Sequence, residues 1–361
     1  MPEMVDEAYK FGCGRYLQGS GVLEQAGKEA ARYSHRAFVI GGPTALSLAG
    51  QRMEQGFRRS QMAWEFCEYG GFCCHTPAKK LAEEARKKGY GVLIGVGGGR
   101  IMDFVKLCAY YAELPVLLVP TSSATCAAYT CLSVIYDETG KTIGNFFLEK
   151  EVEAILADEE ILCAQPLRLA ASGILDSLSK FIEIKNGNPR ITYDAFPIDL
   201  VTAGVLADHT YRTLVDEWAQ ICEDLKVRRL SESIRKLIFM TIPVTGMISG
   251  LSKAVGQSAI GHELYYQLRT YFTKESLGFL HGEIVAVGLL TQLVYNGTPE
   301  EVDGFRKMMR EMGMPISISG LGIEPSRENF ELLYGNLCRT RFVGDSEEKR
   351  SLFRKALLAI F

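Results

Sequence analysis

The chain has 361 residues, enough for two domains that each bury a hydrophobic core. Hydrophobic residues make up 47% of it and charged residues 23%, with a net charge of −3, as in ordinary globular proteins. This balance offers no basic excess for a nucleic-acid partner, and we expect none. The ten cysteines lack the paired spacing of a structural zinc site, which predicts reduced thiols.

The N-terminal residues and the apolar runs bear on location. Residues 1–10 are polar and acidic and lack the apolar core of a secretory signal peptide. No continuous apolar run reaches the length of a bilayer span, so we expect no membrane partner. A cytoplasmic protein is therefore the simplest interpretation.

The first half alternates apolar runs with helical patterns. Near-continuous apolar runs occur at residues 37–40, 91–95 and 115–120, and a helical pattern covers residues 76–89. Strands that are apolar throughout and separated by helices predict a parallel sheet covered on both faces. We therefore expect an α/β domain over residues 1–160, with ligands at the carboxyl ends of its strands.

From about residue 158 onward the strand signals fade. Asp158-Glu159-Glu160 can begin a helix and Pro166 interrupts one, which places a domain boundary between residues 156 and 166. We expect an all-helical domain over residues 161–361, because long helical patterns cover residues 173–186, 198–214, 229–250 and 283–295.

A glycine-rich loop follows the second predicted strand, the apolar run at residues 91–95. Gly97-Gly98-Gly99 precedes a helical run, and bare backbone N–H groups there would let an anionic pyrophosphate approach the helix. Arg100 stands where the dinucleotide fingerprint has its last glycine, and the Lys-Ser/Thr of a P-loop is missing. A tight turn between strand and helix would also use glycine, so the loop alone leaves both interpretations open.

The flanking segments carry more information. Gly97-Gly98-Gly99 with Asp103, followed by Pro-Thr-Ser-Ser-Ala-Thr at residues 120–125, resembles the nucleotide-binding core of iron-containing alcohol dehydrogenases. Residues 14–19, Gly-Arg-Tyr-Leu-Gln-Gly, resemble the opening of the glycerol dehydrogenases in that superfamily. Residues 132–136 match the strand that follows their threonine-rich loop. The resemblance covers most of the first domain.

This resemblance implies a dehydroquinate synthase-like fold, in which a Rossmann-like dinucleotide-binding domain precedes a helical metal-binding domain. It also implies a metal-dependent oxidoreductase that uses NAD(P). By this resemblance Thr121 and Thr125 would contact the cofactor; alternatively, their hydroxyls would stabilise a turn through hydrogen bonds to the backbone. The cofactor contacts implied by the resemblance are Gly41, Gly42, Gly97, Gly98, Gly99, Asp103, Thr121, Ser122, Thr125, Ser133 and Tyr136.

A candidate metal site comes from one carboxylate and two of the five histidines. Asp176 lies in a largely apolar segment, where a charge is costly unless something pairs with it. A single histidine on a helix is more often structural than a ligand. In glycerol dehydrogenases, however, an aspartate and two histidines in similar contexts bind zinc or iron. By that resemblance Asp176, His262 and His281 would bind one divalent ion and act in catalysis through it.

His262 is the least certain of these ligands. The family helix usually carries a second histidine three residues later, where this chain has Tyr265. An alternative alignment would put Ser258 at the ligand position. We prefer His262, because the metal then keeps two imidazoles.

Two departures from glycerol dehydrogenases bear on substrate and cofactor. Cys126 stands where those enzymes carry an aspartate that binds substrate hydroxyls, and residues 124–130 are closer to hydroxycarboxylate dehydrogenases, which act on 2-oxo acids. We expect Cys126 to contact substrate and not to act as a nucleophile. Gly41-Gly42 offers no carboxylate against a 2′-phosphate, so NADP is at least tolerated.

The predicted function is the interconversion of a small alcohol, polyol or 2-hydroxy acid with its carbonyl form, in a chain that we expect to form a homo-oligomer. One alternative is a dehydroquinate synthase-like cyclase, which needs basic residues for a substrate phosphate. Near the predicted ligands the sequence offers chiefly Lys180 and Lys185. Another alternative is a non-catalytic cofactor-binding protein, which would follow if His262 is not a ligand.

Overall fold

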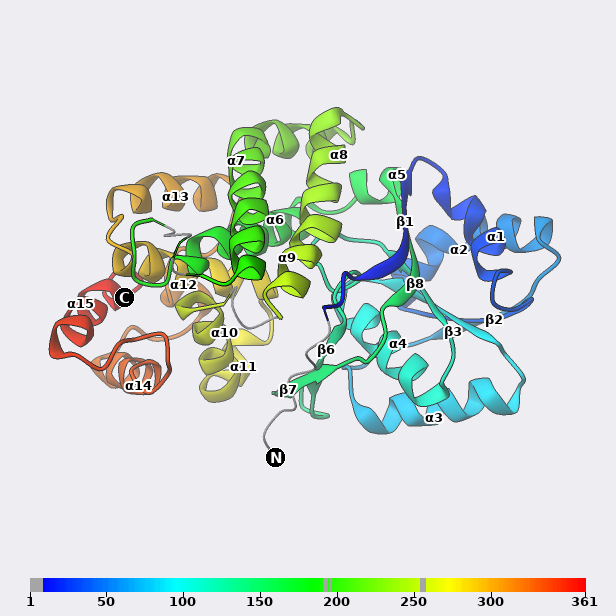
Figure 1. Cartoon of the computed structure of the whole chain (residues 1–361), viewed down its shortest axis with the longest axis horizontal. Helices are drawn as coiled ribbons and strands as arrows, with labels where there is room; N and C mark the ends of the chain where they lie inside the picture. The colour runs from blue at the N-terminus through cyan, green and yellow to red at the C-terminus, as the bar shows by residue number, and fades with distance from the viewer. Residues whose placement is uncertain (1–8, 191–193, 195, 254–257) are drawn as a thin grey trace.

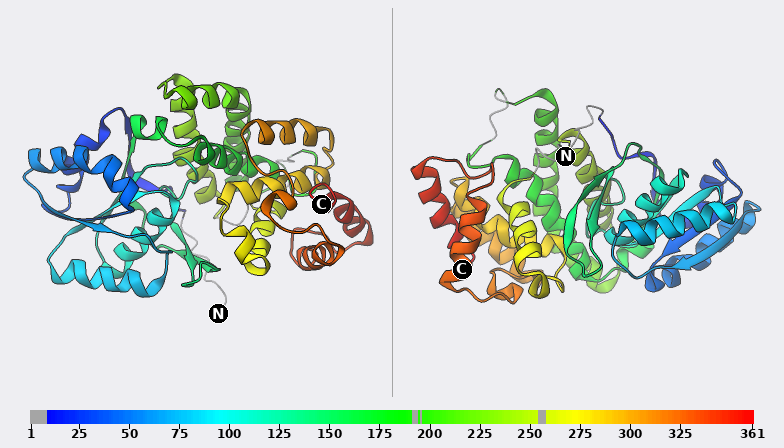
Figure 2. Two further views of the ribbon diagram at one scale, coloured as in Figure 1. Left: turned by 180° about the vertical axis from the view of Figure 1, so that it is seen from behind. Right: turned by 90° about the horizontal axis from the view of Figure 1, so that it is seen from below.

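The computed structural model describes residues 9–190, 194, 196–253 and 258–361. An α/β part built from the first half of the chain lies beside a helical part built from the second half (Figures 1 and 2). The predicted fold class is confirmed. The last strand of the sheet ends at Asp158 and the next long helix begins at Leu167. The proposed domain boundary at residue 160 lies between them and stays a prediction.

The sheet has six strands in the order β1-β8-β5-β4-β2-β3, and every pair is parallel. Three of the four inner strands, β2, β4 and β5, correspond to the three apolar runs of the sequence, whereas the fourth, β8, was not predicted. The edge strands β1 and β3 are only partly buried and carry polar residues, which explains why their sequences gave no strand signal. The bounds are β1 Cys13–Gly19, β2 Arg36–Gly41, β3 Ala63–Glu68, β4 Val92–Gly97, β5 Val116–Pro120 and β8 Val152–Asp158.

Helices cover both faces of the sheet, as predicted. On one face Val39 and Ile94 pack with Phe57, and on the other Phe38 and Leu93 belong to the core that continues into the helical part. Successive side chains of a strand point to opposite faces, so each inner strand supplies both cores. The helices of this part are a 3₁₀ turn at Val22–Gln25, α1 Ala26–Ala30, α2 Pro43–Arg59, α3 His75–Lys87 and α4 Gly99–Ala112.

A separate antiparallel hairpin follows the threonine-rich loop. It consists of β6 (Leu132–Tyr136), which was predicted as a strand, and β7 (Thr142–Phe147), which was not. The Oγ of Ser133 donates a hydrogen bond of 2.9 Å to the carbonyl of Asp103 and so ties the hairpin to α4.

The helical part packs around α12, which is buried along most of its length and contacts α6, α10, α13 and α15. The helices are α5 Glu159–Cys163, α6 Leu167–Ile184, α7 Ile198–Val227, α8 Glu232–Phe239, α9 Thr245–Leu251, α10 Ile260–Tyr271, α11 Thr273–Ser276, α12 His281–Tyr295, α13 Glu300–Glu311, α14 Arg327–Leu337 and α15 Glu347–Leu357, with a 3₁₀ turn at Ser319–Leu321.

Local sequence explains several helix ends. Asp158 begins α5 by accepting hydrogen bonds from the backbone N–H groups of Glu160 and Ile161, as its sequence predicted. The predicted helix over residues 229–250 is present but contains a π-helical turn at Met240–Val244, because Pro243 has no N–H to donate. The structure also extends α7 to Val227, beyond the predicted end at residue 214.

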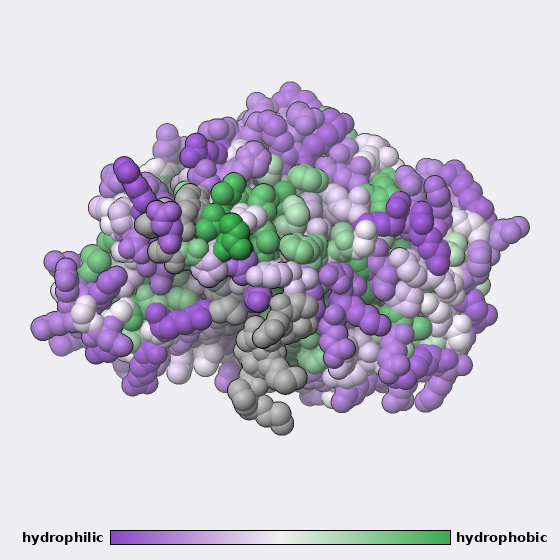
Figure 3. Space-filling view, viewed as in Figure 1, coloured by the Kyte–Doolittle hydropathy of each residue, from purple (hydrophilic) through white to green (hydrophobic). Residues whose placement is uncertain are grey.

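The segment Glu232–Leu251, which contains α8 and α9, is long and apolar enough to span a bilayer by length and composition. The segment is not a continuous apolar run, because it contains Glu232, Arg235 and Lys236, so the expectation that no continuous apolar run is that long stands. Moreover, 67% of the segment is buried inside the protein, as in the core helix of a globular domain. Elsewhere the space-filling view shows an apolar area over α7 (Figure 3), where Ile198 and Val205 are exposed.

The two parts meet where the loop after β5 lies on α6. A Cβ atom added to Gly173 would lie only 1.8 Å from the carbonyl oxygen of Ser123, so the helix backbone and the loop backbone are in direct contact. The side-chain oxygen of Gln165 accepts a 2.9 Å hydrogen bond from the backbone N–H of Ser123 and so holds Ser123 in place. Glycine is therefore required at position 173 by packing.

We predict that Gly173→Ala lowers the free energy of unfolding by about 3 kcal/mol, since backbone atoms cannot yield to the added methyl group. The matched control is Gly304→Ala in α13, where an added Cβ meets nothing within 4 Å. That control should raise stability by about 0.5–1 kcal/mol through helix propensity. Denaturant unfolding of both variants checks the prediction, and equal stability of the two would contradict it.

Candidate metal and cofactor site

Three helices bring the predicted metal ligands together. Asp176 lies on α6, His262 in the first turn of α10 and His281 at the start of α12. The Oδ1 atom of Asp176 is 3.6 Å from Nε2 of His262 and 3.5 Å from Nε2 of His281. An ion bound tetrahedrally about 2.1 Å from each donor atom needs donors about 3.4 Å apart. The donor set thus fits one divalent ion.

Glycines allow these helices to approach closely. A Cβ added to Gly282, next to His281, would lie 2.0 Å from the carbonyl oxygen of Ser172 on α6. One added to Gly288 would lie 2.7 Å from the Cα of Gly261, which precedes His262. Each histidine is therefore next to a glycine at a helix crossing.

The start of α12 is held by a second set of contacts. Glu283 accepts a 2.7 Å hydrogen bond from the N–H of Leu280, and Arg168 of α6 forms a two-pronged ion pair with the same carboxylate at 2.6 and 2.7 Å. These bonds fix the first turn of α12 on α6. His281 keeps 26% of its side chain exposed, so solvent reaches the cluster on this side.

Glu183 orients His262 from behind. Its carboxylate accepts hydrogen bonds from Nδ1 of His262, from the backbone N–H of His262 at 2.9 Å and from that of Ala259 at 2.7 Å. Burial alone would raise the pKa of Glu183, but His262 and these donors hold the pKa below its ordinary value. A carboxylate bonded to Nδ1 directs the lone pair of Nε2 toward Asp176, as metal ligation requires.

Asp176 is paired with a lysine one helical turn away. The Nζ of Lys180 lies 3.3 Å from Oδ1 of Asp176 and 3.1 Å from Nε2 of His262. Burial raises the pKa of Asp176, but the charge of Lys180 and the close contacts with His281 and His262 outweigh this effect, and the pKa is held well below the ordinary value. Asp176 is therefore an ionised carboxylate.

The predicted phosphate loop joins the threonine-rich loop at the carboxyl ends of β4 and β5. A Cβ added to Gly98 would lie 3.2 Å from Oγ of Ser122, and one added to Gly99 would lie 2.9 Å from Oγ1 of Thr125. The N–H of Thr121 donates a 2.9 Å hydrogen bond to the carbonyl of Gly97. Gly41 and Gly42 lie at the end of the neighbouring strand β2.

The other predicted cofactor residues have partners inside the protein. Asp103 lies 3.0 Å from the ammonium of Lys106 and accepts a 3.1 Å hydrogen bond from the N–H of Val134. Burial raises the pKa of Asp103. Asp103 and Ser133 thus support the hairpin on α4, and their contact with a cofactor stays a prediction.

Tyr136 and Tyr265 connect the hairpin to the histidine cluster. Burial is the main reason that the pKa of Tyr136 is raised, and its interaction with Tyr265 raises the pKa further. The ring of Tyr265 packs edge-on against His281, with 4.4 Å between ring centroids. The residue that stands in place of the second family histidine therefore supports a ligand.

Cys126 lies in the loop that faces α6 and is buried. Burial, followed by the charge of Asp176, raises the pKa of its thiol to about 12. The thiol is thus neutral near pH 7, which agrees with the expectation that Cys126 does not act as a nucleophile.

Glu183 was not predicted as a partner of His262, and Lys180 was considered only as a basic residue that could bind a substrate phosphate. A signal was present, because Lys180 and Glu183 follow Asp176 by four and seven residues in an otherwise apolar helix. That spacing places all three on one helix face.

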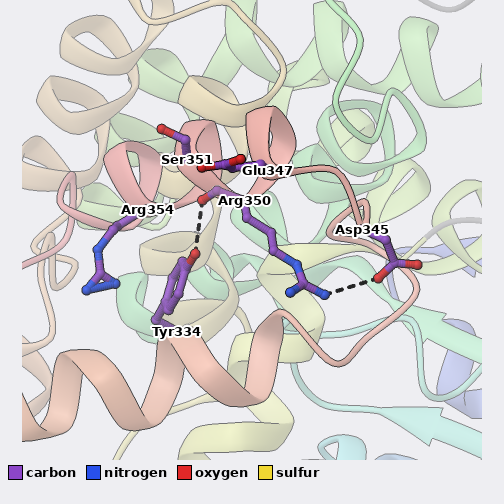
Figure 4. A pocket seen from close by; sticks show the side chains of 6 residues that line it. All are labelled: Tyr334, Asp345, Glu347, Arg350, Ser351 and Arg354. Atoms are coloured by element: carbon purple, nitrogen blue, oxygen red, sulfur yellow. Dashed lines mark hydrogen bonds and ion pairs between the residues drawn. The ribbon is translucent and has the colours of Figure 1, made fainter.

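A surface pocket lies elsewhere, between α14 and α15 (Figure 4), and shares no lining residue with the Asp-His-His cluster. Its arginines are paired, Arg350 with Asp345 at 3.3 Å and Arg354 with Glu331. It is lined by Tyr334, Asp345, Glu347, Arg350, Ser351 and Arg354.

Comparison with known proteins agrees with this geometry. The family model described as iron-containing alcohol dehydrogenase matches residues 13–156. Glycerol dehydrogenase of Escherichia coli is 28% identical over 313 residues, covering 86% of this chain and 84% of its own. Residues 13–156 are therefore similar to the iron-containing alcohol dehydrogenases. The resemblance found in the sequence is thereby confirmed.

Further matches agree with this relationship. Hydroxycarboxylate dehydrogenase A of Escherichia coli is 27% identical over 290 residues, covering 80% of this chain and 78% of its own. The crystal structure of a probable glycerol dehydrogenase from Sinorhizobium meliloti shares the fold with a TM-score of 0.82, at 23% identity and 98% coverage of both chains. These matches favour an oxidoreductase acting on alcohols over the cyclase, and they imply NAD(P) and a divalent metal.

We predict that Glu183→Gln weakens divalent metal binding by about 10- to 100-fold, because the amide no longer fixes the ring and tautomer of His262. The matched control is Glu263→Gln on α10, whose carboxylate accepts a hydrogen bond from Gln267. Calorimetric titration of the metal-stripped variants measures both affinities. Wild-type affinity in Glu183→Gln would show that Glu183 does not orient a ligand.

Proposed function

We propose that this chain is a metal-dependent, NAD(P)-linked dehydrogenase that interconverts a small 2-hydroxy acid, alcohol or polyol with its carbonyl form. The observation that carries the proposal is the convergence of Asp176, His262 and His281 from three helices. The helix α6 that bears Asp176 is also the one on which the loop of residues 121–126 rests. Metal ligands and cofactor loops are thus parts of one packed unit.

The residues have distinct roles in this proposal. Asp176, His262 and His281 hold one zinc or iron ion, and Glu183 keeps His262 in the tautomer that can ligate it. A divalent ion held there would supply Lewis-acid chemistry toward the oxygen of the substrate, and a bound nicotinamide would supply hydride chemistry. His281 lies on the solvent-accessible side of the Asp-His-His cluster, and a small substrate can enter there.

The cofactor loops position the dinucleotide. The N–H groups at Gly98 and Gly99 begin α4, where the helix dipole favours the pyrophosphate. The hydroxyls of Thr121, Ser122 and Thr125 border the same loop. The pair Gly41-Gly42 carries no carboxylate, and a Cβ at Gly42 would meet only the carbonyl oxygen of Tyr69, 3.9 Å away. This room supports the use of NADP(H) at least as well as NAD(H).

Cys126 supports a substrate with a carboxylate or with few hydroxyls. A neutral, buried thiol offers weak hydrogen bonding to a polyol but does not repel an anion. The similarity to hydroxycarboxylate dehydrogenase A is consistent with a 2-oxo acid. We further propose a cytoplasmic homo-oligomer, and the exposed apolar residues of α7 support self-association.

Metal removal tests the proposed function. We expect the chelator-treated enzyme to lose at least about 10³-fold in kcat for NADPH-dependent reduction of 2-oxobutyrate, and added Zn²⁺ or Fe²⁺ to restore it. NADPH should be used at least as efficiently as NADH. Dihydroxyacetone and glycolaldehyde complete the substrate panel. Full activity of a metal-free preparation, or none on any of these carbonyls after reloading, would refute the proposal.

The variant Cys126→Asp tests the substrate side. The new carboxylate accepts hydrogen bonds from hydroxyls and repels a substrate carboxylate, so kcat/KM for dihydroxyacetone should rise by about tenfold relative to 2-oxobutyrate. Cys126→Ser serves as the uncharged control. If Cys126→Asp is folded and metal-loaded but inactive on every substrate, Cys126 takes part in the chemistry itself.

A further inference from the structure

The ammonium group of Lys180 lies among the atoms that would bind the metal. Its nitrogen is 3.1 Å from Nε2 of His262 and 3.3 Å from Oδ1 of Asp176, so it contacts two of the three donor atoms. Only 4% of the Lys180 side chain is exposed. The position follows from the sequence, since Lys180 is one turn after Asp176 on α6.

The ammonium and a metal ion need the same lone pair of His262. Glu183 accepts the hydrogen bond from Nδ1, which leaves Nε2 as the acceptor atom of the ring. In this structure the acceptor faces the N–H groups of Lys180. A metal ligated through Nε2 would use that lone pair, so the contact with Lys180 has to break when the ion binds.

Electrostatics adds to this conflict. An ion bound about 2.1 Å from both Nε2 of His262 and Oδ1 of Asp176 would lie within about 4 Å of the ammonium nitrogen. Two cations that close repel strongly inside a protein, where water screens them little. The nearby carboxylates of Asp176 and Glu183 carry two negative charges, which a divalent ion alone would neutralise.

We propose that Lys180 is an internal cation that takes the place of the divalent ion in the metal-free protein and competes with it for Asp176 and His262. Lys180 links α6 to α10 through its contact with His262 when no metal is present. It also weakens metal binding, because its ammonium must move away from both ligands first. The inference rests on the proposed Asp-His-His metal site, but not on the identity of the substrate.

Replacing Lys180 should therefore change two properties in opposite directions. Lys180→Met keeps the length and apolar stem of the side chain and removes the charge. We expect the metal-stripped variant to unfold at a lower temperature than the metal-stripped wild type, since Asp176 then has no cation. We also expect it to bind Zn²⁺ at least about tenfold more tightly, because repulsion is gone.

The matched control is Lys185→Met at the residue that follows the same helix; the ammonium of Lys185 lies 4.5 Å from the ring centre of Phe181. It should leave metal affinity unchanged. Affinities are measured by competition with a chromogenic chelator, and Co²⁺ absorption reports the coordination of the bound ion. Should Lys180→Met not fold without metal, the same titration is done with Lys180→Gln, which keeps a polar group but no charge.

The outcomes separate this inference from the function on which it rests. Tighter Zn²⁺ binding together with a less stable metal-free form supports competition. Equal or weaker binding by Lys180→Met and Lys180→Gln, in proteins that lose the ion on His281→Ala, overturns the inference and leaves the metal site intact. Zn²⁺ binding that is unaffected by His281→Ala overturns both.

Discussion

The site depends on how closely three helices and one loop can approach without side chains between them. Gly173 brings α6 against the carbonyl of Ser123, Gly282 brings α12 against that of Ser172, and Gly261 meets Gly288 where α10 crosses α12. Each of these contacts lies within three residues of Asp176, His281 or His262. Because backbone packs on backbone, the ligand atoms are held by rigid elements. Substitutions at the glycines should therefore displace the ligand atoms.

The second constraint is charge. The cluster buries two carboxylates, Asp176 and Glu183, in the midst of an apolar helical core, where unpaired charges are costly. Lys180 and the hydrogen bonds to His262 compensate them. A divalent ion would compensate them more fully. The two buried negative charges thus explain why an ion would be favoured there.

Much of this could be predicted from the sequence. The inner strands β2, β4 and β5 are apolar on both faces and were predicted, whereas β1 and β3 at the sheet edges were not, and neither was the inner strand β8, in which Glu153 interrupts the apolar run. Resemblance to a family identified Asp176, His262 and His281. The fold brings them together even though Tyr265 stands where the family usually has a second histidine. An alternative alignment would have placed Ser258 at the ligand position. The geometry supports His262, because its Nε2 is 3.6 Å from Asp176.

What the sequence could not provide were the partners of the ligands. The ion pair between Lys180 and Asp176 and the bond from His262 to Glu183 depend on how α6 faces α10, and helical spacing alone gives only the shared face of α6. The contacts of Asp103 with Lys106 and with the hairpin were likewise not predicted, and its contact with a cofactor stays a prediction. Side chains with such internal partners cannot be told from ligand-binding ones before the packing is known.

The central claim is that one divalent ion is bound by Asp176, His262 and His281. The most direct test is a crystal structure of the Zn²⁺-loaded protein with anomalous diffraction recorded on both sides of the zinc absorption edge. We predict a single strong peak about 2.0–2.2 Å from Oδ1 of Asp176 and from Nε2 of both histidines, with the ammonium of Lys180 moved away. A fully loaded crystal whose zinc lies elsewhere, with Lys180 still bonded to His262, would contradict the account.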